Sequence, residues 1–300
     1  MTGAQVAAEG RVVVGVDGSD PSMRAAVHAA GCARRRGVGL LVVHVTPRQG
    51  AQEAVPMASW EVRERFRESA TALVDAAAGA AREAAGPVQV TAAVVDDYPV
   101  DGLLALSAGA ALLVTGRRGA GGLPGLLLGS TAGALVQHAE CPVIASPDEP
   151  PEHADGDPAS VVVGVEGGPA DEPVLAFAVA EAAARGAVLT AVHAWQELSV
   201  GAGVGGFGPL VDWSAVAEEE QRLLGEAVAP WRTAEPELRI EESLVRERPA
   251  GALLRASAGA DLLVVGHRHR GLLARLGSTT HAVLHRAACP VAVVPIRAEG

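Results

Sequence analysis

Short apolar runs alternate with longer amphipathic stretches along the chain. The first run, VVVGV at 12–16, is rich in β-branched residues, which is typical of a strand buried on both faces of a sheet. A stretch with the length of a helix follows it and ends before Gly37. The same alternation predicts strands over 40–45, 88–95, 112–115 and 142–145, and helices over 62–81, 99–109 and 130–138. Strands that alternate with helices predict right-handed crossovers and a parallel, doubly wound α/β sheet.

The helix predicted over 62–81 is amphipathic. Its apolar residues recur at helical spacing, so one stripe is expected to face the core. The members of this stripe are Val62, Phe66, Ala70, Leu73, Ala77 and Ala81.

The second half of the chain repeats the first. VVVGVDG at 12–18 returns as VVVGVEG at 161–167, which is an offset of 149 residues. Three further segments return in the same way: SAGAALLVTG at 107–116 as SAGADLLVVG at 257–266, GST at 129–131 and again at 277–279, and CPV at 141–143 and again at 289–291. Nearly constant offsets indicate a tandem duplication, with a two-residue deletion between Gly266 and Gly277.

An acidic segment rich in proline separates the two copies. Residues 148–160 read DEPPEHADGDPAS and lack apolar periodicity, so they are expected to form a linker. The predicted organisation is therefore a first domain over 1–147, the linker over 148–160, and a second domain over 161–300.

Composition and charge narrow the classes of partner. The formal charge of −11 over 300 residues argues against a nucleic-acid partner or an anionic membrane partner. No run of 18 apolar residues occurs, and the first residues do not resemble a secretion signal. The three cysteines form no CxxC motif, which favours free thiols in a reducing cytoplasm.

A glycine-rich loop follows the strand predicted at 112–115. It runs from Gly116 through Gly119 and nine further residues to Gly129, Ser130 and Thr131, where a helix is expected to begin. Free N–H groups at a helix start favour an anion, and the two hydroxyls add donors. The alternative is a flexible loop with an ordinary Ser/Thr cap. The loop contains no Gly-Lys-Ser/Thr, so it is not a Walker A motif.

The pattern G-x2-G-x9-G-S/T resembles the ATP-binding signature of the universal stress proteins. The segments VVVGVDGS, LLVVHV and HAECPVIASP match that family in order, and the resemblance covers both halves. It implies two tandem α/β domains, each a five-stranded, mostly parallel sheet of order 3-2-1-4-5 with helices on both faces. It also implies an adenine nucleotide, ATP with or without Mg²⁺, across the strand ends. Assembly through the fifth strand would give an intrachain pseudo-dimer, with a homodimer as the alternative.

The resemblance also assigns roles to residues of the first copy. Asp17 would face the nucleoside, although an aspartate after a strand is also a common turn residue. Val45 would offer its backbone groups to adenine. The residues expected at the ribose and phosphates are Gly116, Gly119, Gly129, Ser130 and Thr131.

The second copy departs from the pattern, so its nucleotide site is expected to be weaker. Its corresponding residues are Glu166, Ala194, Gly266, Gly277, Ser278 and Thr279. His269 stands where the second motif glycine would be. His267 and His269 form no metal site on our interpretation, because an arginine lies between them and no nearby Cys, Asp or Glu completes the ligands. This basic loop is either a phosphate-binding patch or a solvated surface loop.

Three functions remain open from the sequence. The first is a cytoplasmic, ATP-binding stress-response protein that acts as a nucleotide-dependent binding or regulatory module. The second is a nucleotidyl-transfer or ATP-hydrolysing enzyme on a related fold, although no nucleophile–base pair is visible and no catalytic residue is assigned. The third is a structural tandem module without a nucleotide, which the intact first motif disfavours.

Overall fold

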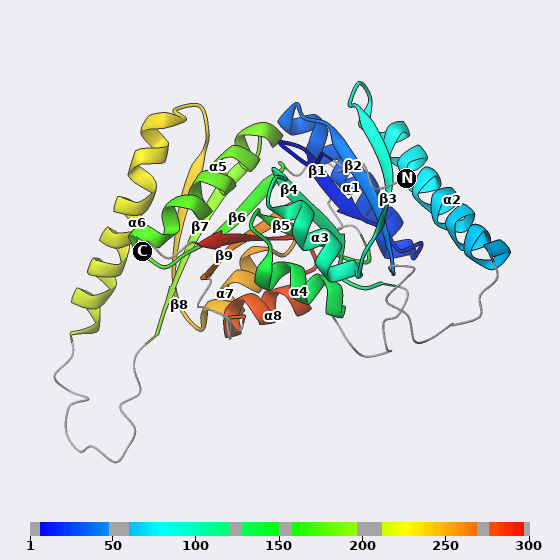
Figure 1. Ribbon diagram of the computed structural model, residues 1–300. Coiled ribbons are helices and arrows are strands. Elements are labelled where there is room, and N and C mark those ends of the chain that lie inside the picture. The colour runs from blue at the N-terminus through cyan, green and yellow to red at the C-terminus, as the bar shows by residue number, and fades with distance from the viewer. Residues whose placement is uncertain are drawn as a thin grey trace, which may run out of the picture. The chain divides into compact units, whose positions relative to one another are not determined.

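The computed structural model describes residues 7–47, 60–119, 128–149, 158–196, 212–268 and 276–296 (Figure 1). The chain forms two compact units. The first comprises the described residues up to Glu149, together with Arg268, Leu276 and those from Pro290 onward. The second comprises the described residues from Pro158 to His267 and from Gly277 to Cys289. Most of the predicted linker lies outside the described residues.

The first unit contains a sheet of the predicted order. Its parallel strands are ordered β3-β2-β1-β4-β5, so the doubly wound prediction is confirmed here. The register places Val12 of β1 between Leu40 of β2 and Leu112 of β4, and all three side chains are fully buried. The strand bounds are β1 (Val12–Gly15), β2 (Leu40–Thr46), β3 (Val90–Asp96), β4 (Leu112–Gly116) and β5 (Val143–Ser146).

The helices of the first unit pack in two pairs, α1 against α2 and α3 against α4. Their bounds are α1 (Asp20–Arg36), α2 (Trp60–Ala85), α3 (Pro99–Ser107) and α4 (Ser130–His138). Helix α1 begins after Ser19, whose hydroxyl accepts the N–H of Ser22, and ends at Gly37 in a left-handed conformation with φ of 66°. Local sequence therefore sets both ends of the helix that packs on β1.

Small residues form much of this core, because aromatic side chains make up only 3% of the chain. In α1, Ala25, Ala26, Ala29 and Ala30 are fully buried, which allows the helix to lie close to the sheet. In the stripe of α2, Ala70, Ala77 and Ala81 are buried and Leu73 is half-buried, but the first two members are exposed: Val62 to 40% and Phe66 to 68%. The first turns of α2 therefore contribute little to the core.

The second unit follows the same chain order. Its parallel strands are ordered β9-β6-β7-β8. The strand bounds are β6 (Ser160–Val165), β7 (Val188–Trp195), β8 (Ile240–Arg246) and β9 (Leu262–Arg268). The helix bounds are η1 (Pro169–Asp171), α5 (Glu172–Arg185), α6 (Trp213–Ala234), α7 (Pro249–Ala256) and α8 (Ser278–Arg286).

The last strand, β10 (Val291–Ile296), groups with the first unit, although the repeat places it in the second copy. It pairs antiparallel with β5, with Val293 opposite Val143 and Val291 opposite Ala145. This pairing covers the edge that β5 would otherwise expose. The compact units therefore follow strand pairing, whereas the boundary at 161–300 follows the repeat.

The described helices and cysteines bear on two further expectations. No described helix combines the length and the apolar character that crossing a bilayer requires. Cys32, Cys141 and Cys289 are buried free thiols. Burial raises the pKa of Cys141 to about 12, so this thiol stays neutral and packs as a small apolar side chain.

Candidate functional site

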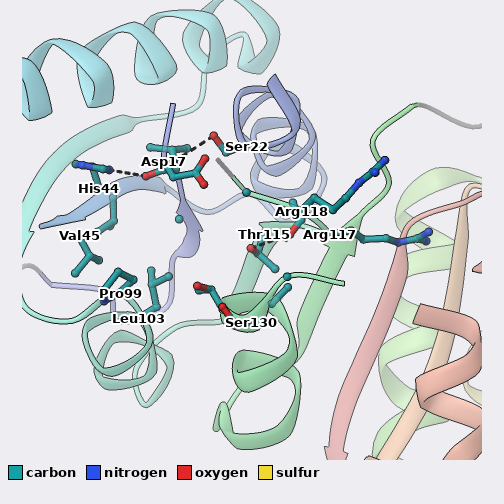
Figure 2. A pocket seen from close by; sticks show the side chains of 18 residues that line it. Asp17, Ser22, His44, Val45, Pro99, Leu103, Thr115, Arg117, Arg118 and Ser130 are labelled. Carbon is teal, nitrogen blue, oxygen red and sulfur yellow. Dashed lines mark hydrogen bonds between the residues drawn. The ribbon is translucent and has the colours of Figure 1, made fainter. Parts of the chain in front are cut away.

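A cavity of about 420 Å³ lies at the carboxyl ends of β1, β2 and β4 (Figure 2). The strand order reverses at β1, and doubly wound sheets bind their ligands at such a point. The volume is within the range of small-molecule sites. All seven residues that the sequence singled out in the first copy line this cavity: Asp17, Val45, Gly116, Gly119, Gly129, Ser130 and Thr131.

Asp17 follows β1 and is held in a tight turn. Its Oδ1 accepts the backbone N–H of Ser19 at 3.0 Å and the Ser19 hydroxyl at 2.6 Å. Its own N–H donates to Ser22 Oγ at 3.2 Å. The exposed carboxylate thus has the turn role that the residue type suggests, yet it also lines the cavity. The two interpretations of Asp17 are compatible.

The end of β2 forms the wall opposite the glycine-rich loop. The pairing of β2 with β1 stops at Gly15 and Val43, so His44 and Val45 extend beyond the neighbouring strand. His44 Nδ1 lies 2.7 Å from Val16 O and donates its proton there, because a carbonyl oxygen can only accept. Val45 is 8% exposed as a whole residue, and it lines the cavity.

Two glycines let the loop approach closely. A Cβ added to Gly119 would overlap Asp17 Oδ2, so a side chain there would displace the Asp17 carboxylate. At Gly129 a Cβ would lie 3.3 Å from the backbone oxygen of Arg117, which is tighter than nearly all real Cβ contacts. The Gly129 N–H also donates to that oxygen at 2.7 Å. Glycine here allows the loop to approach without a shift of the Arg117 backbone, whereas the φ of −69° at Gly129 suits any residue.

The start of α4 faces the cavity without a side-chain cap. Gly129 is the N-cap residue and supplies no cap hydrogen bond. Ser130 and Thr131 follow as the first helical residues, and both line the cavity. The first N–H groups of a helix lack intrahelical acceptors, and the helix dipole favours negative charge at this end. This arrangement suits a phosphate group.

Other parts of the wall were not anticipated from the sequence. Leu103 and Pro99 of α3 and Thr115 of β4 line the cavity beside the predicted residues. A Cβ on Gly15 would come within 2.8 Å of Leu103, so α3 packs directly onto the end of β1. The predicted helix at 99–109 gave no signal of which of its side chains would face a ligand.

Arg117 and Arg118 line the cavity, but their guanidinium groups are directed away from Asp17 and Ser130 (Figure 2). Arg117 is buried at 7% exposure. Arg118 forms an ion pair with Asp148, which follows β5. Arg117 is therefore buried, and Arg118 is partly exposed and paired with a carboxylate.

In the second copy, an internal carboxylate occupies the loop after β6. Asp171 stands where the first copy has Ser22 and is 5% exposed. Its Oδ2 accepts three backbone N–H groups, from Glu166 at 3.0 Å, Gly167 at 2.7 Å and Gly168 at 3.1 Å. The backbone N–H groups of this turn thus donate to Asp171 and are not available to a ligand.

Replacing Asp171 by alanine is expected to lower the free energy of unfolding of the second unit by about 2 kcal/mol, because buried donors lose their acceptor. Urea unfolding followed by tryptophan fluorescence measures this, since Trp195, Trp213 and Trp231 lie in that unit. Asp171→Asn keeps one acceptor oxygen and should lose less. Unfolding of the alanine variant at the wild-type urea concentration would contradict the role assigned to this carboxylate.

The rest of the second site also differs from the first. β9 continues through His267 and Arg268, whereas β4 ends at Gly116, the match of Gly266. Among the described residues, the atom nearest to a Cβ on Gly277 would be Thr280 Oγ1 at 4.0 Å. The remaining residues singled out in this copy are Glu166 and Ala194 near strand ends, and Ser278 and Thr279 at the start of α8. His269 lies outside the described residues.

The histidine that matches His44 has an additional partner in the second copy. His193 Nδ1 lies 2.8 Å from Val165 O, and its Nε2 lies 2.8 Å from Glu220 Oε2. Both ring nitrogens therefore face oxygen atoms, which hold the imidazole from two sides. Ala70 holds the corresponding place in α2, and the first copy has no such carboxylate there.

No group of three or more His, Cys, Asp or Glu side chains is placed to hold a metal ion within the part of the chain that the structure describes.

Comparison with known proteins places the chain among named relatives. A family model described as the universal stress protein family matches residues 10–147 and 159–295. Universal stress protein Rv2005c of Mycobacterium tuberculosis (strain ATCC 25618 / H37Rv) is 38% identical over 290 residues, which cover 94% of this chain and 96% of that protein. Rv2623 of the same strain is 35% identical over 288 residues, with 94% and 95% covered. The crystal structure of a universal stress protein from Archaeoglobus fulgidus DSM 4304 has a TM-score of 0.68 at 17% identity, covers 95% of this chain and 98% of that one, and shares the fold.

Proposed function

The chain belongs to the universal stress protein family, and we propose that its first repeat binds an adenine nucleotide, ATP foremost, in the cavity at the strand ends. The observation that carries this proposal is the convergence of three features on one cavity: the Asp17 turn, the extended end of β2 at Val45, and the uncapped start of α4. The β2 end suits the base, and the helix start suits the phosphates.

We propose that the bound nucleotide acts as a regulatory ligand. Occupancy would order the loops around the cavity and so bias the surface that a partner recognises. We assign no residue a catalytic role in this proposal. His44 donates through Nδ1 to Val16 O, which orients the ring and leaves Nε2 as an acceptor. Mg²⁺, when present, would be held mainly by the phosphates and water, as is usual for this ion in nucleotide sites.

The cellular location, the classes of partner and the assembly are inferred from the sequence and stay predictions. They comprise a cytoplasmic location, no nucleic-acid or membrane partner, and assembly as an intrachain pseudo-dimer or as a homodimer. The antiparallel pairing of β5 with β10 supports the intrachain form.

The test is a set of titrations of the full chain with adenosine, AMP, ADP, ATP and GTP, followed by a turnover assay with each nucleotide that binds. We expect adenine ligands to bind in preference to GTP, without multiple turnover. Rapid turnover with release of product would favour the enzyme alternative. The absence of binding by every adenine ligand would favour the structural module.

A further inference from the structure

The ion pair between Arg118 and Asp148 connects the wall of the cavity to the residues after β5. Arg118 lines the cavity, and its guanidinium is directed away from Ser130 (Figure 2). Its partner Asp148 stands two residues after β5 ends at Ser146 and is the first residue of the linker predicted over 148–160. The Arg118 side chain is 45% exposed and that of Asp148 is 22% exposed, so a ligand can reach the pair.

The carboxylate is incompletely satisfied by this contact. Asp148 Oδ2 pairs with Arg118, but Oδ1 is buried and has no hydrogen-bond partner among the described residues. A partly exposed ion pair is worth little, and a buried oxygen without a donor lowers that value further. An anion with more negative charge can therefore replace Asp148 as the partner of Arg118.

A guanidinium binds carboxylate and phosphate oxygens through the same paired donors. We propose that the Asp148 carboxylate competes with the phosphates of the bound nucleotide for the guanidinium of Arg118. This inference rests on the proposed function of the cavity. A di- or triphosphate at the start of α4 carries more negative charge than one carboxylate, so it would draw Arg118 away from Asp148. Adenosine lacks phosphate and leaves the pair intact.

Asp148 thereby sets how strongly the site distinguishes a nucleotide from its nucleoside. Each Arg118–Asp148 contact must be broken before the guanidinium binds phosphate, which reduces the gain that phosphates contribute. In the second copy Arg268 matches Arg118, but Ile296 stands where the first copy has Asp148. An aspartate at this position of the repeat therefore occurs in the first copy and not in the second.

The test compares ATP with adenosine in calorimetric titrations of the full chain. In Asp148→Asn we expect ATP to bind about fivefold more tightly than in wild type, the upper range for an exposed ion pair, while adenosine affinity stays unchanged. Glu149→Gln removes a charge from the neighbouring exposed residue and should leave both affinities within about twofold of wild type.

A double-mutant cycle separates competition from general charge repulsion. Arg118→Gln should weaken ATP binding about fivefold, and adding Asp148→Asn to it should then change nothing. An equal gain from Asp148→Asn with and without Arg118 would overturn the inference, because charge removal would suffice. If the Asp148→Asn variant binds ATP and adenosine only as tightly as wild type does, the inference is overturned and the proposed function stands. Failure of wild type to bind either ligand would overturn both.

Discussion

The Gly129→Val variant is expected to bind ATP at the first repeat at least about 30-fold more weakly than wild type, a loss of about 2 kcal/mol. The Cβ would press on the backbone oxygen of Arg117 at 3.3 Å, and the added methyl groups would extend beyond it. The loop and the start of α4 would separate slightly, so the N–H groups at the helix start would no longer converge on a phosphate. Isothermal titration calorimetry measures the loss.

Gly277→Val is the matched control that the chain itself provides. Both glycines are N-cap residues of a nine-residue helix, so both variants share the cost of valine at that position. At Gly277, however, the nearest atom of the described residues to a new Cβ lies 4.0 Å away. The Gly277→Val control should therefore bind ATP at the first repeat as tightly as wild type does. Wild-type ATP affinity in Gly129→Val, with an unchanged circular dichroism spectrum, would eliminate the proposed phosphate loop.

The second large effect concerns stoichiometry: one ATP is expected to bind tightly per chain, and the second repeat is expected to bind at least about tenfold more weakly. In the first copy, the turn after β1 presents Asp17 to the cavity. In the second, the N–H groups from Glu166 to Gly168 are bound to Asp171, which also adds a negative charge to that loop. Negative charge near a phosphate site opposes binding.

Titration of the full chain with ATP separates the two sites. Wild type should give one tight site, Gly129→Val should lose it, and Gly277→Val should keep it. Two sites of equal affinity, or loss of the tight site in Gly277→Val, would show that the differences in the second copy do not matter for binding.

The sequence could predict the elements that depend on local pattern. β-branched runs placed β1 and β2, and the repeat placed their counterparts in the second copy, because buried strands and strand-to-helix turns depend on residue type over short spans. The same logic brought Asp17 and Gly129 to one cavity, since parallel strands end at the same edge.

Contacts between distant residues could not be predicted in this way. Arg118 and Asp148 are 30 positions apart, and neither their identities nor their spacing indicates an ion pair. Periodicity identified the apolar stripe of α2 but could not show which of its members other elements cover. Phe66 belongs to the stripe and is nevertheless exposed. The alignment of the repeats places Asp171 opposite Ser22, but its three N–H donors depend on the fold of the turn, so the sequence did not predict its role.

Native mass spectrometry of the full chain tests the central claim most directly. Wild type and Gly129→Val are incubated with ATP under identical conditions, and any bound molecule is identified by its mass after denaturation. We predict one tightly bound adenine nucleotide per wild-type chain and none at the same concentration in Gly129→Val. Wild-type protein that retains no nucleotide at saturating ATP, or a variant that retains as much as wild type, would contradict nucleotide binding at the first repeat.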